Sequence, residues 1–442
     1  MSTIYGNVVG GFVATDTILK ESGKAADAKV VGDKFNKLEE EIIDTRGSIV
    51  YGFHVNSNES DPSEAVTYLR DAVGMSPAKM DFSNGVFNWG SWKNAFFIPR
   101  PCMLKSDGTV AYYLNPNDYS KKEDGSDSDI SNVDFDGNAM MEWGRYGKRI
   151  WYKIEADYGD DTSYSVYIAD HKEDAEFHCY SFYNKNNDLM EHFYTPIYSG
   201  SLDSSNRLRS LSGMSIMHSK TGTQEISYAK ANGYCWNIEV WSDKLLMFLL
   251  LYLMGKSLDI QSVYGQGNST GGSSASSLIN TGTLNDKGLF FGHSDGSKKV
   301  KVFGMEDQYG EQWNRTLGLM LNNGIYYYKL TEGTIDGSTC TGYPTNNTNG
   351  MIFAGSSPTS NGYVNKFSVK DGKIILPSSS TGSSSTFYCD YFYQNQRGVT
   401  MALLGGGSYY GAYCGLYVSL GSTVSVARWD FGAALSCKPL VG

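Results

Sequence analysis

Closely spaced glycines constrain the fold of the last part of this chain more than any other feature does. From Cys389 onward, glycines such as Gly405, Gly411 and Gly415 alternate with a dense set of tyrosine, serine, alanine and valine residues. Glycine permits tight turns, tyrosine supplies stiff contact area at low entropic cost, and serine adapts to different partners. The segment therefore has the composition of a recognition surface carried on a glycine framework.

The same segment lacks residue types that the rest of the chain uses. Between Ala402 and Ser436 there is no lysine, glutamate, glutamine or methionine. Two spaced patterns run through it, Gly-Gly-x-x-x-x-Gly-x-x-x-Gly-x-x-x-x-Leu from Gly405 and Trp-x-x-Gly-Ala-x-Leu-Ser-Cys-Lys-Pro from Trp429. This frame resembles the variable region of the target proteins of diversity-generating retroelements, which are best known as phage tropism determinants with a C-type-lectin-like fold.

The resemblance implies which residues vary and which stay fixed. In that family, asparagine codons are randomised at their adenines, and such codons cannot become codons for lysine, glutamate, glutamine, methionine or tryptophan. The residues expected to vary and to contact a ligand are Tyr409, Tyr410, Ala412, Tyr413, Cys414, Tyr417, Ser422, Thr423, Val424, Ser425, Val426, Ala427, Arg428 and Asp430. The expected fixed frame is Gly405, Gly406, Gly411, Gly415, Trp429, Gly432 and Leu435. An ordinary tyrosine- and glycine-rich strand-and-loop region at the end of a β-rich domain is the alternative interpretation.

Length and charge limit the class of protein. With 442 residues, the chain is long enough for two or three domains and a substantial core. Its formal net charge is -10 and the sequence has no basic stripe, so we expect no nucleic-acid binding. The longest apolar run, residues 245–254, is about half a membrane span. It predicts a buried helix rather than insertion into a membrane.

Cysteines and acidic residues give no clear metal site. The seven cysteines are scattered, and no C-x-x-C pair or Cys/His cluster has zinc spacing. We expect buried thiols in a reducing cytoplasm, although a bridge between Cys389 and Cys437 stays open. The acidic loop at residues 124–137 has oxygen ligands that suit Ca²⁺, but it lacks the spacing of an EF-hand. A solvated acidic turn without a metal is therefore the prediction.

Motifs for catalysis are missing from the sequence. It contains no H-E-x-x-H and no G-x-S-x-G pattern. Lectin-fold oxidases use paired cysteines with copper, but Cys414 falls at a position that we expect to vary, where a catalytic thiol would not be left. A glycan depolymerase would need a pair of carboxylates in a cleft, and no such pair is legible. We therefore expect no enzymatic activity and no cofactor.

The first 48 residues form a distinct N-terminal segment. Its apolar residues follow heptad spacing on a stretch rich in lysine and glutamate, at Ala28, Val31, Phe35, Leu38 and Ile42. This spacing predicts a short coiled-coil-like helix, and we expect a homotrimer; an amphipathic helix packed on its own domain is the alternative. Residues 23–35 resemble the N-terminal attachment region of phage tail and fibre proteins, which implies contact with other virion proteins.

Residues 49–200 have the pattern of a β-rich region. Alternating apolar residues predict strands over residues 49–55, 109–114, 149–155 and 164–169. Residues 62–73 predict one helix, capped by Ser60 or Asp61. The segments at 139–143 and 193–198 resemble a block of phage tail proteins that forms the front part of the lectin-like fold. The region is therefore either a separate domain or the first part of one large domain.

Residues 201–442 are expected to form the C-type-lectin-like domain, with a variable region at about 391–434. A helix is predicted over 225–232, and a second one, capped by Ser242 with Asp243 in its first turn, is predicted to continue to Met254 and Gly255. The segment at 304–313 is similar to the Gly-x-Glu-Asn-x-x-Gly-Asn-x-Trp motif of the lectin-like subgroup related to formylglycine-generating enzymes. It carries Asp307 and Glu311 where that motif has asparagine.

These patterns predict an α+β fold class, with a C-type-lectin-like C-terminal domain, a β-rich middle region and a short N-terminal coiled-coil-like helix. The resemblance implies a phage receptor-binding protein in the virion, on tail or capsid, assembled in the host cytoplasm. Its diversified face would bind a host cell-surface protein or glycan, with tyrosines as anchors and with polar contacts from Arg428 and Asp430. The alternative is a structural virion component, such as a head fibre or baseplate decoration.

Overall fold

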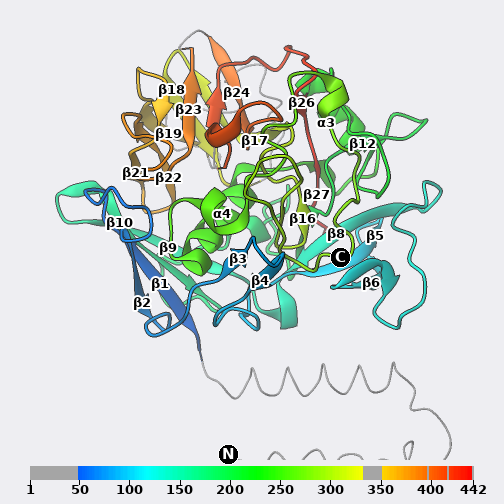
Figure 1. The fold of residues 1–442 in the computed structure, drawn as a ribbon, viewed down its shortest axis with the longest axis horizontal. Helices are drawn as coiled ribbons and strands as arrows, with labels where there is room; N and C mark the ends of the chain where they lie inside the picture. The colour runs from blue at the N-terminus through cyan, green and yellow to red at the C-terminus, as the bar shows by residue number, and fades with distance from the viewer. Residues whose placement is uncertain (1–47, 332–350, 396–397, 416–417, 441–442) are drawn as a thin grey trace, which may run out of the picture. The chain divides into compact units, whose positions relative to one another are not determined.

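The computed structural model describes residues 48–331, 351–395, 398–415 and 418–440. The expected N-terminal helix and its trimer seam lie outside the described residues. Residues 49–442 form one unit of the fold. This unit is mostly β-sheet with few helices, as Figure 1 shows. The β-rich character expected of the middle region thus extends through the described part of the chain.

A four-stranded antiparallel sheet begins this unit, with strand order β2-β1-β10-β9. Its strands are β1 (Val50–Val55), β2 (Val66–Arg70), β9 (Trp151–Asp157) and β10 (Asp160–Ala169). The strands expected at 49–55, 149–155 and 164–169 are confirmed. Each alternates buried apolar side chains with more exposed ones, which is the pattern that a sheet with one covered face requires.

The helix expected over residues 62–73 is wrong. The Asp61 carboxylate accepts a 2.8 Å hydrogen bond from the Ser63 amide and closes a turn, after which the chain continues as strand β2. Val66 and Tyr68 are buried on one face of this strand, and Val66 pairs with Val55 of β1. Pairing with the open edge of β1, together with burial of alternate side chains, outweighs the local helical spacing.

A seven-stranded sheet joins the two regions that the sequence separates. Its strand order is β14-β27-β11-β8-β5-β6-β7. The strands are β5 (Arg100–Lys105), β6 (Val110–Asn115), β7 (Asp118–Lys122), β8 (Gly137–Trp143), β11 (Phe193–Pro196), β14 (Trp236–Ile238) and β27 (Leu435–Cys437). The strand expected at 109–114 is confirmed as β6. Since β14 and β27 extend a sheet begun by earlier strands, residues 49–200 and 201–442 share one framework.

The described residues contain three α-helices. They are α3 (Gly222–Lys230), α4 (Trp241–Gly255) and α5 (Ile260–Tyr264). The two expected helices are confirmed as α3 and α4, and every residue of α4 is buried. Figure 1 shows α4 amid the strands. The expected cap at Ser242 is wrong, because α4 begins at Trp241 with Val240 at its cap. In the described part of the chain, no helix has the length and apolar character to span a membrane.

An eight-stranded sheet carries the C-terminal segment. Its order is β19-β18-β17-β24-β25-β23-β20, and β26 pairs with β17 in parallel. The strands are β17 (Trp313–Asn322), β18 (Ile325–Lys329), β19 (Met351–Ser356), β20 (Gly362–Tyr363), β23 (Tyr391–Gln394), β24 (Val399–Leu404), β25 (Val418–Leu420) and β26 (Phe431–Gly432). The segments expected to vary therefore lie in the connections after β24 and between β25 and β26.

Short elements complete the described fold. The two-stranded pairs are β3 (Lys79–Asp81) with β4 (Val86–Asn88), β12 (Ser201–Leu202) with β13 (Leu208–Arg209), β15 (Lys301–Val302) with β16 (Met305–Glu306), and β21 (Lys366–Lys370) with β22 (Ile374–Ser379). The 3₁₀ turns are η1 (Arg145–Gly147), η2 (Tyr180–Phe182), η3 (Ala275–Ser277) and η4 (Gly411–Tyr413).

Candidate binding surface

Three glycines of the C-terminal frame occupy backbone positions that strongly favour glycine. Gly405, Gly406 and Gly415 have φ values of +92°, +74° and +106°. A Cβ atom at Gly406 would lie 2.5 Å from the sulfur of Cys414, and one at Gly415 would lie 2.0 Å from Oδ1 of Asp390. These glycines therefore satisfy both a conformational and a steric requirement.

Three more frame residues pack against other parts of the fold. A Cβ atom at Gly432 would lie 2.0 Å from Oε1 of Gln312, and Leu435 on β27 is completely buried. Trp429 is only half-buried, and its ring lies 5.5 Å from the ring of Tyr409 between centroids. Trp429 thus belongs both to the frame and to the surface above it.

The residues expected to contact a ligand differ in exposure. Exposed side chains are those of Tyr409, Ala412, Tyr413, Thr423, Ser425, Ala427 and Arg428, and half-buried ones are those of Tyr410, Ser422 and Val426. Tyr417 lies outside the described residues. Cys414, Val424 and Asp430 are buried, so these three side chains do not face the solvent. We name the exposed and half-buried residues of this set, with Trp429, the aromatic surface.

Fixed residues hold the β25–β26 connection by its main-chain carbonyl groups. The carbonyl oxygen of Ser422 accepts from the Met401 amide at 3.0 Å, and that of Val424 accepts from the Gly222 amide at 2.8 Å. Beyond these, the oxygen of Val426 accepts from Nη2 of Arg315 at 3.0 Å, that of Arg428 from the Ser219 amide at 2.8 Å, and that of Asp430 from the Trp313 amide at 3.0 Å. All five donors lie outside the set expected to vary. Since every residue type has a carbonyl oxygen, this attachment does not depend on the side chains of the connection.

The β24–β25 connection is attached in the same way. Nε2 of Gln261 donates to the carbonyl oxygens of Ala412 at 3.2 Å and Cys414 at 2.6 Å. The amide of Gly411 donates to the carbonyl oxygen of Ser269 at 2.8 Å. Helix α5 and the loop that follows it therefore hold the main chain of η4, which carries Tyr413, without bonds to the tyrosine ring.

Arg428 and Tyr409 are oriented by one buried carboxylate. Nε and Nη2 of Arg428 each donate to Asp430 at 2.8 Å, and the Tyr409 hydroxyl group donates to Oδ2 of Asp430 at 3.1 Å. Asp430 is completely buried, whereas 44% of the Arg428 side chain is exposed. The two-point pairing with Asp430 fixes the plane of the guanidinium group, which leaves its outer edge available to a ligand.

Tyr413 belongs to an aromatic cluster whose other two members are not among the residues expected to contact a ligand. The Tyr413 ring stacks on that of Tyr391 with centroids 4.2 Å apart, and it meets the Tyr363 ring edge-on at 5.3 Å. Tyr391 and Tyr363 come from the adjacent strands β23 and β20. The half-buried Tyr363 and Tyr391 side chains extend the aromatic surface beyond the residues expected to contact a ligand. Tyr391 stands at the start of the expected variable region, but Tyr363 lies outside it, and its contact depends on strand pairing.

The segment at 304–313 supports the surface from below. The Gly310 amide donates to the carbonyl oxygen of Gly405 at 3.0 Å, and Glu311 forms a parallel bridge with Gly407. Glu311 is buried, and its Oε1 accepts from the Ile279 amide at 2.6 Å. Burial raises the pKa of Glu311 to about 8. Glu311, which stands where the motif has asparagine, therefore serves as a buried acceptor for a neighbouring loop.

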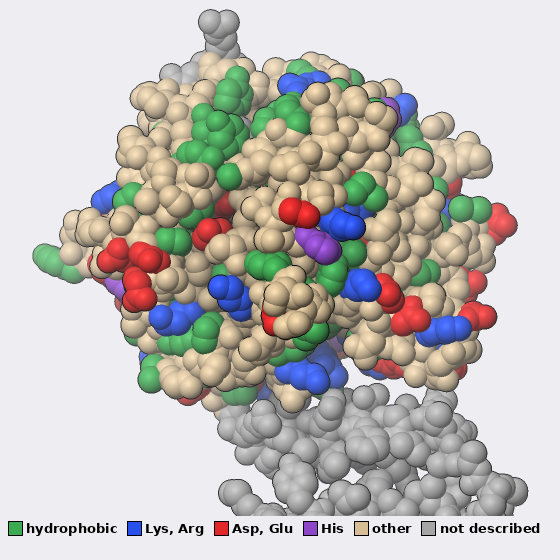
Figure 2. Space-filling view, in the orientation of Figure 1, with side chains coloured by type: hydrophobic (Ala, Val, Ile, Leu, Met, Phe, Trp, Pro, Cys, Tyr) green, Lys and Arg blue, Asp and Glu red, His purple; other side chains and the backbone are tan. Residues whose placement is uncertain are grey.

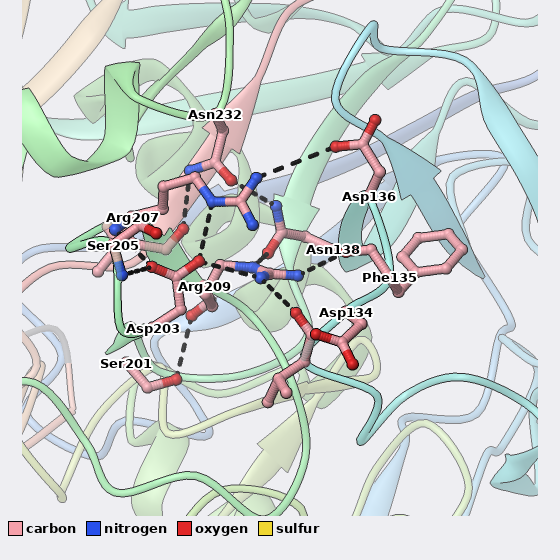
Figure 3. A network of polar contacts seen from close by, with 12 residues as sticks. Asp134, Phe135, Asp136, Asn138, Ser201, Asp203, Ser205, Arg207, Arg209 and Asn232 are labelled. Atoms are coloured by element: carbon pink, nitrogen blue, oxygen red, sulfur yellow. Dashed lines mark hydrogen bonds and ion pairs between the residues drawn. The ribbon is translucent and has the colours of Figure 1, made fainter.

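The acidic loop at 124–137 is held by an internal cation. The buried Arg209 guanidinium donates to the carbonyl oxygens of Val133, Phe135 and Gly137 at 3.1, 2.9 and 2.8 Å, and to the Asp203 carboxylate at 3.2 Å (Figure 3). Among the described residues, no group of three or more histidine, cysteine, aspartate or glutamate side chains is placed to hold a metal ion. Arg209 thus supplies positive charge where carbonyl oxygens converge.

Charge on the surface is sparse and mixed. On the face shown in Figure 2, acidic and basic side chains are scattered among larger uncharged areas. On the aromatic surface, Arg428 is paired with Asp430, and its neighbours are tyrosine, serine, threonine, alanine and valine. This arrangement offers aromatic contact area and hydrogen-bonding groups, which suits binding to a ligand. Comparison with protein-family models and with curated proteins finds no match for this sequence.

Proposed function

We propose that the protein is a phage receptor-binding protein whose aromatic surface binds a ligand on the host cell. The observation that supports this most is the attachment of the β25–β26 connection by main-chain carbonyl groups. Side chains such as Thr423, Ser425 and Ala427 can then change without loss of the bonds that position them. A surface built in this way suits a protein that must change its ligand while keeping its fold.

The fold assignment that goes with this proposal is a C-type-lectin-like domain. It is supported by the order of elements, in which α3 and α4 precede a long glycine-rich region of strands. Its last strand, β27, lies between β11 and β14 in the seven-stranded sheet. The proposed assembly is a trimer that attaches to the virion through residues 1–48. Three copies would multiply a modest affinity at each surface.

Cell binding by purified protein tests the receptor role. We expect labelled full-length protein to bind particular bacterial strains, and we expect the triple variant Tyr409→Ala, Tyr413→Ala, Arg428→Ala to lose at least about 100-fold in affinity. The matched control, Tyr158→Ala, Tyr234→Ala, Arg70→Ala, changes the same residue types at exposed positions elsewhere. Equal binding by both variants would contradict the assignment of this surface. Binding to no strain would favour the structural virion role instead.

Sequencing of the encoding gene tests diversification separately. We expect substitutions in clonal phage populations to fall on adenines within the codons of the variable set. Codons of the frame, such as those of Gly415 and Trp429, should stay uniform. A reverse transcriptase gene and a template repeat near the encoding gene would agree with this result. Uniform codons throughout the segment would rule out the retroelement part of the proposal while leaving receptor binding open.

A further inference from the structure

Two cysteines from distant parts of the sequence meet at one edge of the seven-stranded sheet, where β14 pairs with β27. Cys235 directly precedes β14, and Cys437 ends β27. The two strands are antiparallel neighbours, with Trp236 opposite Cys437. The sulfur atoms of Cys235 and Cys437 lie 3.4 Å apart. A disulfide bond of about 2.0 Å therefore requires them to approach by little more than an ångström.

We propose that Cys235 and Cys437 form a disulfide bond under oxidising conditions. This pairing differs from the bridge between Cys389 and Cys437 that the sequence left open. The sulfur of Cys389 lies 3.7 Å from the carbonyl oxygen of Thr386, whereas Cys437 has the sulfur of Cys235 beside it. The proposal depends on this juxtaposition alone and holds whether or not the protein binds a host receptor.

Solvent exposure determines which of the two cysteines reacts first with an oxidant. Cys437 is completely buried, but Cys235 is 6% exposed and follows Tyr234, which is 64% exposed. With hydrogen peroxide as the oxidant, the Cys235 thiolate attacks one peroxide oxygen and expels hydroxide. Cys235 is then a sulfenic acid, and the hydroxide takes up a proton to give water. The Cys437 sulfur then attacks the Cys235 sulfur, losing its proton and releasing a second water, so two electrons pass from sulfur to peroxide.

Other cysteines lie in surroundings that disfavour the same reaction. Burial raises the pKa of the Cys102 thiol well above its usual range and raises the pKa of Cys179 to about 12. Burial likewise raises the pKa values of Cys389 and Cys414. A thiol with a raised pKa holds little thiolate, which is the reactive form. Cys235 is more exposed than these four thiols and has the sulfur of Cys437 beside it, so we expect oxidation to be selective for this pair.

The bond would close a covalent loop around much of the protein. The loop runs from Cys235 to Cys437 and includes α4, the eight-stranded sheet and the aromatic surface. Restricting so long a loop in the unfolded chain stabilises the fold, and for a protein of this size we expect the Tm to rise by about 5 °C on oxidation. The C-terminal strand would then be fixed to β14 by a covalent link as well as by hydrogen bonds.

Peptide mapping of the full-length protein tests the proposal. After peroxide treatment and alkylation in denaturant, trypsin digestion without reduction should yield residues 231–244 joined to residues 429–442. These two peptides contain Cys235 and Cys437 as their only cysteines. Recovery of both peptides separately, or of either joined to another cysteine, would overturn the assignment. A Cys102→Ser variant, which alters a buried cysteine outside the pair, should still give the joined peptides.

Single variants test the order of attack. With Cys437→Ser, a sulfenic acid should persist at Cys235 and react with dimedone, whereas Cys235→Ser should leave Cys437 unlabelled. Both variants should lose the Tm difference between oxidised and reduced protein. This comparison is made within each variant, so it holds even where a substitution lowers stability. Labelling of Cys437 instead of Cys235 would contradict the proposed order, and a retained Tm difference would contradict the pair.

Discussion

Asp430 differs from its neighbours because its own side chain is buried while it orients two exposed ones. It accepts two hydrogen bonds from Arg428 and one from Tyr409. In Asp430→Asn, the amide nitrogen faces a guanidinium group and cannot accept from it. We expect a loss of about 1–3 kcal/mol in the free energy of unfolding, measured by urea denaturation. Ser425→Asn, at an exposed site nearby, should change it by less than about 0.5 kcal/mol. Equal effects would mean that Asp430 is as replaceable as its neighbours.

Two glycines of the frame make a matched pair for a second test. Gly415 and Gly411 both have positive φ, but a Cβ atom at Gly415 would lie 2.0 Å from Asp390, whereas one at Gly411 meets nothing within 4 Å. We expect Gly415→Ala to destabilise the protein by about 3 kcal/mol or more and Gly411→Ala by about 1–2 kcal/mol. Urea denaturation of both variants measures the difference. Similar losses would show that steric contact at Gly415 is unimportant.

The raised pKa of buried Glu311 predicts that the stability of the fold depends on pH. Burial raises its pKa from 4.5 to about 8, so the folded state binds a proton more tightly than the unfolded state does. This contribution is fully favourable below pH 4.5 and is lost as pH rises through about 8. We expect Glu311→Gln, which imitates the protonated form, to flatten the fall of Tm between these pH values. Glu64→Gln, at an exposed site, should leave the profile unchanged. An unaltered profile in Glu311→Gln would contradict the role of Glu311.

At the scale of elements, Arg315 connects strand β17, helix α3 and the β25–β26 connection. Its Nε donates to Glu225 of α3 at 2.5 Å, and its Nη2 donates to the carbonyl oxygen of Val426. Both charged side chains are fully buried. We expect Arg315→Met to cost about 3–5 kcal/mol, since it leaves a buried carboxylate without its partner. Adding Glu225→Leu should recover part of that loss, and a double-mutant cycle measures the coupling. Additive losses would show that the pair is not coupled.

Prediction from sequence succeeded where an element determines its own structure and failed where a distant segment does. Residues 245–254 are apolar on all sides, so a buried helix was predictable, and α4 confirms it. Residues 62–73 carry helical spacing, but the edge of β1 draws Val66–Arg70 into the sheet. The contact of Tyr413 with Tyr363 and Tyr391 was likewise unpredictable, because it depends on how β20 and β23 pair.

The same distinction applies to the aromatic surface. Glycine spacing predicted its framework, and the family resemblance implied contact tyrosines, of which the structure places Tyr409 and Tyr413 at the surface and leaves Tyr410 half-buried. Nothing in the sequence indicated that Cys414 and Val424 turn inward. Nor could it show that Gln261, from a helix about 150 residues earlier in the chain, holds the main chain of η4. Polar contacts between distant segments produce no periodic pattern in the sequence, so they could not be predicted from it.

At the scale of the whole molecule, residues 49–442 form a unit of their own. We therefore expect a chain truncated to 49–442 to fold with an unchanged Tm. If residues 1–48 hold three copies together, this chain should be a monomer by light scattering and should bind cells on the order of 100-fold more weakly than the full chain. A truncated chain that remains trimeric would place the assembly contacts elsewhere.

The way in which the β25–β26 connection is held has a consequence for protein engineering. The hydrogen bonds that hold it are accepted by main-chain carbonyl oxygens, which all twenty amino acids have. The fold therefore does not depend on which side chains occupy the outward positions. A synthetic library randomised at Thr423, Ser425 and Ala427 should consequently contain mostly folded members. Selection from such a library for new ligands would be limited by the number of clones made rather than by how many of them survive folding.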